Sequence, residues 1–539
     1  MTSIGTYWRT VRHLKIRQIA GRASFRLGAR KPSERRAPFL RDSVDKWVLP
    51  ARRRQILIAP ERFRLLNRER ALDEGGWDPP DEEKLWRYNL HYFDDLNAFN
   101  AEERRGWHVA LIERWIIENP PVEGVGWEPY PTSLRIVNWV KWALGGGPLQ
   151  PAAIESLAVQ ARWLMRRVEW HLLGNHLFAN AKALFFAGLF FRGPEADRWR
   201  NRAISIFRRQ LDEQILGDGG QFELTPMYHL LAFEDVLDLL ACIRCFGAQD
   251  RNVAWLDDQL RSKGTRMWAW AQTMRYRDGS LPRFNDCSEG VSPALHELAR
   301  VANALALVSP AEPGVPVLHL AESGYVRLDW SGAMAFLDVA RIGPDYLPGH
   351  AHADSLSFEL AIGDDQIVVN RGTSCYGLSV RRHYERSTAA HSTVEVFNQS
   401  SSEMWSGFRV GRRAQPSGLR VTQSSVTCSH DGYRFLPGSP RHERCWTMLD
   451  HGLRIDDSVS GGLDAIARYH LNLDVHASEI SPGTWSIRRA DREVARVAFR
   501  AAWVRKVTGE QAVEFGSLVP AQTLEIGLKG GQASACWSW

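Results

Sequence analysis

The hydrophobic pattern of this 539-residue chain changes its period once, near residue 309, and this change limits the folds available to it. Before it, apolar residues recur every three to four positions, as in amphipathic helices. After it, apolar and polar residues alternate, as in strands with one buried face. The proline-rich segment 309–316 between the two patterns is typical of a linker. The sequence therefore predicts a multidomain α+β protein, helical first and β-rich second.

The helical pattern consists of long apolar-periodic segments joined by short connections that carry Gly, Pro and Asn. About nine antiparallel helices joined in this way are typical of an α-solenoid or an (α/α) toroid. We expect residues 1–84 to form an arginine-rich, irregular lead-in with a few short elements, and residues 85–308 to form the helical domain. The predicted helices span Tyr88–Phe99, Trp107–Ile117, Ser133–Leu144, Ala152–Leu172, His176–Phe191, Glu195–Ile215, Tyr228–Phe246, Trp255–Met274 and Ala294–Leu307.

The second region, residues 309–539, has short alternating segments separated by turn signals, which is typical of an antiparallel β-sandwich. The predicted strands span Gly324–Asp329, Ala333–Ala340, Leu356–Ile362, Gln366–Asn370, Ser392–Phe397, Val421–His430, Glu443–Asp450, Gly452–Ser458 and Ile466–Leu473, with tail strands at Trp485–Arg489, Val497–Arg500 and Thr523–Lys529. A chain of this length exceeds what one hydrophobic core usually supports, which agrees with at least two domains.

The amino-acid composition indicates which kinds of ligand the chain can bind. The apolar fraction and charged content are those of a globular protein. The net charge of +6 comes mainly from arginine and suits an acidic ligand. Because no basic run is interleaved with aromatic residues, nucleic-acid binding is not indicated.

The cellular compartment is predicted from the cysteines and the amino terminus. The seven cysteines are odd in number and mostly scattered, which favours free thiols in a reducing compartment. Residues 1–30 lack the apolar core of a signal peptide, and no segment has the length and apolarity of a transmembrane helix. We therefore expect a cytoplasmic location, with the periplasm as the alternative. The basic and apolar residues of this stretch predict a solvated helix packed on the next domain, with contact to a membrane surface as the alternative.

A cluster of histidines lies at the start of the β-rich region. His350, His352 and Asp354 follow the turn signal Pro348-Gly349 and enter a predicted strand, and two further strand ends carry Asn370 and His391. Histidine transfers protons near neutral pH and is the commonest metal ligand, so this pattern indicates a site. A pair of solvated loop histidines is the alternative interpretation. If the strands are neighbours, these histidines and Asn370 lie together.

The helical domain holds further polar candidates. Asn175 and His176 begin a predicted helix. An asparagine at this position has a structural explanation, because it can cap the helix. Two polar side chains beside exposed backbone N–H groups would also suit an anion. Tyr228 begins another helix after a glycine-rich loop. Arg283 and Asn285 lie in a polar loop after a long helix and are candidates for substrate binding.

Aromatic residues crowd one part of the helical domain between residues 107 and 142. Sugars stack on such rings, which makes Trp127 and Tyr130 candidates for substrate contact. Most tryptophans are core residues, so burial is the alternative for each of them.

Four motifs together resemble the heparinase II/III family of polysaccharide lyases. They are Gly-Asn-His (174–176), Gln-Phe-Glu-Leu-Thr-Pro-Met-Tyr-His (221–229), Gly-His-Ala-His-Ala-Asp-Ser-Leu-Ser-Phe (349–358) and Ala-His-Ser-Thr-Val (390–394). The resemblance covers about residues 85 to 400, and it implies an amino-terminal α/α toroid followed by an antiparallel β-sandwich. The stretch 88–93, Tyr-Asn-Leu-His-Tyr-Phe, also resembles a branch found beside exopolysaccharide biosynthesis proteins.

The resemblance implies β-elimination next to a uronic acid. The site must neutralise the uronate carboxylate, remove the weakly acidic proton beside it, and protonate the leaving sugar oxygen. By the match, Asn175 neutralises the carboxylate with help from Arg283, Tyr228 is the base or acid, and His176 and His350 are the remaining proton carriers. A tyrosinate base would need a lowered pKa, which a nearby cation could provide.

The resemblance also implies a structural zinc, with His352, Asn370 and His391 at the ligand positions. Asn370 stands where the family has an aspartate, and an amide is a poorer zinc ligand than a carboxylate. Either a neighbour such as Asp354 substitutes for it, or these groups form a hydrogen-bonded cluster without zinc.

Two other functions remain open at this point. A polymer-level uronate epimerase would use the same proton abstraction without cleaving the chain, and a non-catalytic exopolysaccharide-binding or biosynthesis protein would dispense with the proton carriers. The expected partner is an anionic polysaccharide or oligosaccharide. A chain without a signal peptide fits intracellular handling of imported oligosaccharides or a role in a biosynthetic cluster. The polymer, its sulfation, endo or exo action and the oligomeric state do not follow from the sequence.

Overall fold

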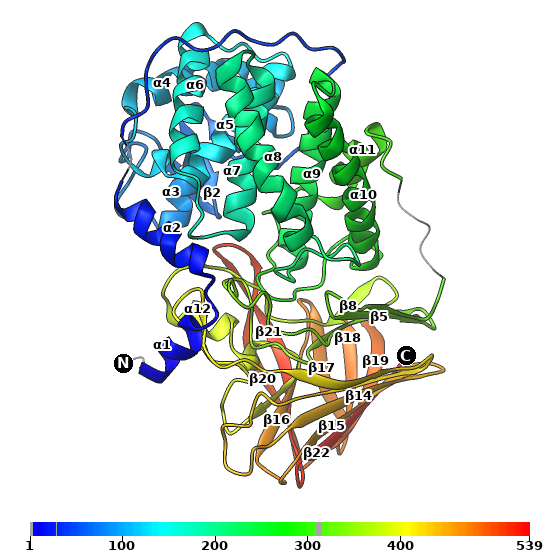
Figure 1. Cartoon of the computed structure of the whole chain (residues 1–539). Coiled ribbons are helices and arrows are strands. Elements are labelled where there is room, and N and C mark those ends of the chain that lie inside the picture. The colour runs from blue at the N-terminus through cyan, green and yellow to red at the C-terminus, as the bar shows by residue number, and fades with distance from the viewer. Residues whose placement is uncertain (1–3, 29, 309–313) are drawn as a thin grey trace.

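The structure is a computed structural model that describes residues 4–28, 30–308 and 314–539. Figure 1 shows the helices gathered at one end of the molecule and the sheets at the other, with the long helices standing on the sheet layer. The helices of the first region end at Ala304 and the strands of the second begin at Val317. The predicted order, helices first and antiparallel sheets second, is confirmed. Residues 309–313 of the predicted linker lie outside the described residues.

The helical region has a large apolar core supplied mainly by helices α5 to α10, and α7 is buried along almost its whole length. Some long helices pack on the next helix in the chain, as α7 does on α8 and α9 on α10, and others pack on the next but one, as α5 does on α7. The helices are α3 (Lys84–Leu90), α4 (Arg105–Glu118), α5 (Pro129–Leu144), α6 (Pro151–Arg166), α7 (Gly174–Phe190), α8 (Pro194–Gln214), α9 (Pro226–Phe246), α10 (Arg251–Thr273) and α11 (Leu295–Ala304), with 3₁₀ turns η1 (Asp94–Asn97), η2 (Ala101–Arg104) and η3 (Val125–Trp127).

Two predicted helices end earlier than their apolar period suggests. The predicted helix Ala152–Leu172 stops at Arg166, and the chain then turns to present the start of α7. The predicted helix Tyr88–Phe99 consists of α3 followed by η1, because Phe93 adopts a left-handed backbone with φ of 61° that no α-helix continues through. Apolar spacing alone does not show such breaks.

The lead-in is more regular than the predicted irregular stretch with short elements. It contains two helices, α1 (Ile4–Val11) and α2 (Ile16–Arg26), and a three-stranded sheet of β1 (Leu57–Ala59), β2 (Arg62–Leu65) and β3 (Arg68–Ala71). Figure 1 shows both helices along one outer edge of the molecule, spanning from the helical region to the β region.

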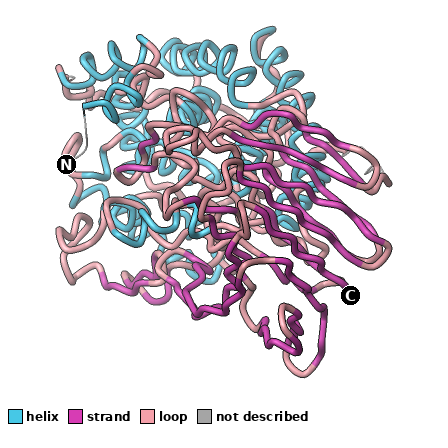
Figure 2. The backbone as a smooth tube through the Cα atoms, turned by 90° about the horizontal axis from the view of Figure 1, so that it is seen from below, coloured by secondary structure: helices cyan, strands magenta, loops and turns pink. Residues whose placement is uncertain are grey.

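The β region consists of an eight-stranded sheet, a four-stranded sheet, a five-stranded sheet and a small hairpin, all antiparallel. Figure 2, which views the molecule from below, shows their long strands lying roughly side by side in front of the helices. The eight-stranded sheet has the order β12-β13-β14-β15-β22-β19-β18-β17, the four-stranded sheet β20-β21-β16-β9 and the five-stranded sheet β4-β5-β6-β7-β8. One apolar core fills the space between them, as in a sandwich.

The strands begin and end as follows: β4 (Val317–Leu320), β5 (Tyr325–Trp330), β6 (Ala333–Asp338), β7 (Phe358–Ile362), β8 (Asp365–Val368), β9 (Val394–Val396), β10 (Met404–Trp405), β11 (Arg409–Val410), β12 (Pro416–Val421), β13 (Ser425–His430), β14 (His442–Leu449), β15 (Gly452–Val459), β16 (Ala465–His470), β17 (Val475–Ser481), β18 (Thr484–Arg489), β19 (Arg492–Arg500), β20 (Trp503–Glu514), β21 (Ser517–Gly527) and β22 (Gln532–Ser538). Between β8 and β9 the chain forms the short helix α12 (Val380–Glu385) and the turn η4 (Thr388–Ala390).

The strand prediction misses several strands, and for β20 the burial pattern explains why. The predicted strand Val421–His430 is the hairpin of β12 and β13, and β17, β20 and β22 are absent from the prediction. Strand β20 is mostly exposed or half-buried and rich in charged residues, so its alternation of apolar and polar residues is weak.

In the described part of the chain, no helix is long and apolar enough to cross a membrane.

Candidate active site

A cavity of about 2120 Å³ lies between the helical and β regions. Its walls come from segments far apart in the sequence: the inner side of α1 and α2, the start of α7, the first turn of α9, the loop after α10 and the loop before β7. Arginine and lysine outnumber aspartate and glutamate among the described lining residues. The cavity therefore suits a large anionic ligand.

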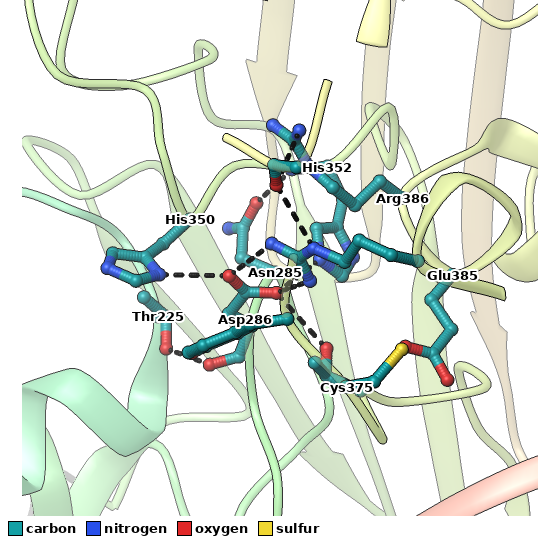
Figure 3. Close-up of polar contacts among 12 residues, drawn as sticks. Thr225, Asn285, Asp286, His350, His352, Cys375, Glu385 and Arg386 are labelled. Atoms are coloured by element: carbon teal, nitrogen blue, oxygen red, sulfur yellow. Dashed lines mark hydrogen bonds and ion pairs between the residues drawn. The ribbon is translucent and has the colours of Figure 1, made fainter. Parts of the chain in front are cut away.

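Asp286 holds two of the predicted histidines in place beside this cavity (Figure 3). One carboxylate oxygen bonds His350 Nδ1 at 2.9 Å, and the other bonds His352 Nε2 at 2.8 Å. Both also pair with the guanidinium of Arg382, and Thr373 donates a further hydrogen bond. Burial would raise the pKa of Asp286, but Arg382 and the two histidines outweigh burial and hold that pKa well below its usual range. Asp286 is therefore an ionised, fully buried anchor.

The ring of His350 is oriented by this anchor. An ionised carboxylate only accepts hydrogen bonds, so Nδ1 of His350 carries a proton and donates it to Asp286. In the neutral ring, Nε2 then keeps a free lone pair, and His350 is one of the residues that line the cavity. A histidine held in this tautomer is suited to accept a proton from a bound substrate.

Tyr228 lies against the face of His350, with the ring centroids 4.0 Å apart. Its hydroxyl is 3.0 Å from the hydroxyl of Tyr376, which also lines the cavity. Burial and the neighbouring Tyr376 raise the pKa of Tyr228 well above its ordinary value. The expectation that a nearby cation lowers this pKa is therefore wrong, because the groups in contact with Tyr228 are a second phenol and an imidazole. Tyr228 carries its proton at neutral pH and is placed to donate it.

Asn175 and His176 enter the cavity from the first turn of α7. The turn depends on Gly174, whose φ is +54° and whose missing side chain leaves room for Leu347, since a Cβ would lie 2.3 Å from Leu347 Cδ2. His176 bonds Glu169 at 3.2 Å and lies against Tyr130 at 4.4 Å between ring centroids. Burial lowers the pKa of His176, but Glu169 outweighs it and the pKa is raised. The raised pKa favours the cationic form of His176.

Glu223 lies between these groups and has an incomplete set of hydrogen bonds. It is 1% exposed, lines the cavity and accepts hydrogen bonds from the backbone of Asn175 and the side chain of Gln221. Its second oxygen, Oε2, is 3.7 Å from His350 Nε2 and bonds no group in the described residues. Burial raises the pKa of Glu223, which favours the neutral acid. A neutral carboxyl here can donate a hydrogen bond to a bound carboxylate.

The four predicted substrate-binding residues divide into two pairs. Tyr130 and Arg283 line the cavity. Trp127 does not, because it is buried in the helical core, where its indole donates to the carbonyl of Asn119. Asn285 is buried in a loop, donating to the carbonyl of Leu224 and accepting from the backbone of His352. These contacts correct the prediction for Trp127 and Asn285, which support the fold and the histidine loop rather than a ligand.

The three predicted metal ligands lie behind the cavity wall. His352 Nδ1 and His391 Nε2 face each other at 3.1 Å. The opposite nitrogens donate to acceptors, His352 to the carboxylate of Asp286 and His391 to the carbonyl of Ser387 at 2.7 Å. Two neutral rings held in this way direct their lone pairs at each other across 3.1 Å, an arrangement that a metal ion or a shared proton between them would satisfy. Histidines that bind a metal are typically held by such outer acceptors.

The third predicted ligand is less suited to a metal. The side-chain oxygen of Asn370 accepts a hydrogen bond from the backbone of Ser392 at 3.0 Å. The carboxylate of Asp354 accepts from the backbone of Asn285. Among the residues that the structure describes, no group of three or more His, Cys, Asp and Glu side chains could hold a metal. The predicted third ligand, Asn370, offers an amide oxygen, and the carboxylate of Asp354 interacts electrostatically with His391.

Sequence reasoning brought Asn175, His176, Tyr228 and His350 to one cavity but gave no role to Asp286, Glu223, Tyr376 or Arg382. Asp286 and Glu223 both lie within polar motifs that the sequence analysis singled out. The available signal was a carboxylate beside residues already predicted for the site, since Glu223 lies in the motif that carries Tyr228 and Asp286 directly follows Asn285. Arg382 lies in the short helix α12 and Tyr376 in the loop before it, and no local pattern marks either residue.

Comparisons with known proteins agree with the fold. Residues 152–307 match the family model for the heparinase II/III N-terminus, and residues 312–536 match the model for the heparinase II/III-like C-terminal region. A solved structure of heparinase III aligns with a TM-score of 0.67 at 16% identity, covering 86% of this chain and 79% of that one. This structural match confirms the predicted fold, a toroid followed by a β-sandwich.

Two curated proteins that are similar in sequence to this chain have names that describe different functions. A heparin-sulfate lyase of Bacteroides stercoris is 26% identical over 264 residues, 46% of this chain and 38% of the relative, so the chain spans well under half of that protein's length. FtsZ-localized protein C of Caulobacter vibrioides is 25% identical over 442 residues, 76% of this chain and 73% of the relative.

Proposed function

The chain belongs to the heparinase II/III family, and from this premise we propose that it is a polysaccharide lyase that cleaves a uronic-acid-containing polysaccharide by β-elimination. The observation that carries the proposal is the meeting of Asn175, His176, Tyr228 and His350 in one cavity with a cationic lining. Lyases of this class need a carboxylate-binding group, a base and an acid within one site. These residues can supply all three.

The uronate carboxylate would bind at the start of α7. Asn175 can donate its amide, Glu223 its neutral carboxyl hydroxyl, and His176 a positive charge supported by Glu169. Hydrogen bonds to that carboxylate stabilise the enolate-like charge that develops when the neighbouring proton leaves. Because Glu223 is buried and neutral, this pocket gains a donor without adding a repelling charge.

Proton transfer would pass between His350 and Tyr228. The Nε2 lone pair of His350 takes the proton beside the uronate carboxylate, the C–O bond to the leaving sugar breaks as a C=C bond forms, and Tyr228 protonates the departing oxygen. The high pKa of Tyr228 suits a proton donor rather than a standing base. The 4.0 Å between the two ring centroids supports this assignment, because both side chains would then reach one sugar linkage.

We further propose that the cation between His352 and His391 is a structural zinc, with the oxygen of Asn370 as the third protein ligand. Zinc here would tie the loop before β7 to the turn before β9 and would take no part in proton transfer. Elemental analysis of the purified chain should find about one zinc per chain, as expected for a structural site, and His391→Ala should lose both the metal and thermal stability. A metal-free chain whose stability is unchanged by chelation would instead assign the position to a proton.

Ultraviolet absorbance tests the proposed lyase activity, because β-elimination leaves a conjugated, absorbing double bond in the product. The purified chain would be incubated with heparan sulfate, hyaluronan, alginate and bacterial exopolysaccharides, and with a polymer that lacks uronic acid as the control. Heparan sulfate comes first because a matched relative is named a heparin-sulfate lyase. We expect absorbance to rise with at least one uronate polymer and to stay flat with the control.

A flat trace on every polymer would contradict the lyase proposal. Exchange of solvent protons into an uncleaved polymer would then identify an epimerase. Absence of exchange would favour a non-catalytic binding or assembly role, which the longer match to FtsZ-localized protein C makes the alternative to compare.

A further inference from the structure

Helices α1 and α2 are attached to the molecule by their polar sides. On α1, Thr6 and Arg9 bond the carboxylate of Glu403, and Thr10 accepts a hydrogen bond from the indole of Trp405. On α2, Gln18 is buried and donates to the carbonyl of Tyr346. The residues at four-residue spacing along this inner side, Thr10, Leu14, Gln18 and Arg22, line the cavity.

The opposite, solvent-facing sides of the two helices are apolar. Ile4, Tyr7, Trp8 and Val11 recur at helical spacing on α1, and Ile16, Ile19, Ala20, Ala23 and Leu27 continue the pattern along α2, all of them exposed. Ile4 is 89% exposed, Ile16 85% and Leu27 88%. Single exposed apolar residues are ordinary, but a row along two successive helices marks an interaction surface. We call these nine residues the outer apolar face.

The charge around the outer apolar face selects its partner. Residues 1–33 contain eight lysines and arginines and no aspartate or glutamate. Within this segment, Arg12, Lys15 and Arg26 are exposed. The guanidinium carbon of Arg12 lies 5.5 Å from the centroid of the Trp8 ring. A second copy of the chain would bring the same basic segments together, which opposes self-association. An anionic surface that also accepts apolar side chains would match both the basic charge of this segment and the outer apolar face.

We propose that the outer apolar face docks on an anionic lipid surface, with α1 and α2 lying in the plane of the membrane interface. Tyr7 and Trp8 have the amphipathic rings that favour this interface, and basic residues beside an apolar face are typical of helices that lie on membranes. The helices would lie on the bilayer without crossing it. Since their inner side lines the cavity, docking would hold the cavity next to the membrane, whatever the cavity acts on.

Vesicle co-sedimentation of the full chain tests this proposal. We expect the chain to pellet with vesicles of phosphatidylglycerol and phosphatidylcholine, to remain in solution with phosphatidylcholine alone, and to be released by high salt. The double variant Trp8→Ser, Ile16→Ser should bind the anionic vesicles at least about tenfold more weakly, because two interfacial apolar side chains are lost. Arg12→Glu, Arg26→Glu should weaken binding by its charge while leaving the apolar face intact.

The matched control changes apolar residues that are exposed elsewhere. Ile480→Ser, Val519→Ser lies on strands β17 and β21 and should bind vesicles like the wild type. A wild-type chain that stays in solution with anionic vesicles overturns the proposal, as does unchanged binding by both test variants. Size-exclusion chromatography adds one more outcome: a wild-type dimer that Trp8→Ser, Ile16→Ser dissociates would assign the face to a second copy and overturn lipid docking.

Discussion

Replacing Tyr228 with phenylalanine is expected to lower kcat on a responsive uronate polymer by about 10²–10⁴-fold, the usual contribution of a positioned general acid or base. The substitution removes the hydroxyl that would protonate the leaving oxygen and keeps the ring that lies against His350. Since the carboxylate pocket at Asn175, His176 and Glu223 stays intact, KM should change little. Initial rates of product absorbance over a range of substrate concentrations separate the two parameters.

Tyr376→Phe is the matched control for this experiment. It removes a phenol hydroxyl from the same cavity, 3.0 Å from that of Tyr228, but leaves the proposed acid in place. We expect a loss of kcat of about tenfold or less, corresponding to one hydrogen bond to a catalytic group. Equal losses in both variants would show that the phenol pair acts as a unit. A Tyr228→Phe variant with wild-type kcat would exclude Tyr228 as the acid.

Most helices and strands were predictable because an element that buries one side has apolar residues at a regular spacing. The exceptions are elements in which burial does not impose that spacing. Helix α7 is buried almost throughout, and the flanking motifs still marked its start near Asn175. Strand β20 gains its place by pairing with β21 rather than by burying an apolar face, so its sequence carries little signal. The lead-in was predicted to hold one solvated helix, whereas the structure has two, α1 and α2, whose apolar side faces solvent and whose polar side is attached to the molecule.

The site was predictable where a residue carries its own chemistry, as histidine and tyrosine do. It was not predictable where the role depends on contacts between distant segments. Asp286 contacts residues that follow it by 64 to 96 positions, and nothing in its own loop shows this. Trp127 illustrates the reverse error, because a tryptophan in an aromatic-rich segment can equally well fill the core.

Asp286→Asn is expected to have the second large effect, on both stability and catalysis. The amide keeps the shape of the side chain but removes the charge that balances buried Arg382, and its NH₂ group would face the donors now bonded to the carboxylate. Leaving a buried charge without its partner costs about 3–5 kcal/mol in the free energy of unfolding. Chemical denaturation followed by circular dichroism measures this loss. We also expect kcat to fall by roughly 10²–10⁴-fold at temperatures where the variant is folded, because His350 loses the acceptor that fixes its tautomer.

Asp457→Asn separates these two consequences. Asp457 is buried in the β-sandwich, where it pairs with Arg444 and accepts from His442 at 2.8 Å, an arrangement much like that of Asp286 with Arg382 and its histidines. None of these three side chains lines the cavity. Asp457→Asn should therefore destabilise the chain by a similar amount while the folded fraction keeps its kcat. If both variants lose stability and both keep kcat, Asp286 is only a structural anchor, and the tautomer of His350 does not depend on it. If only Asp286→Asn loses kcat, the carboxylate positions the proposed base.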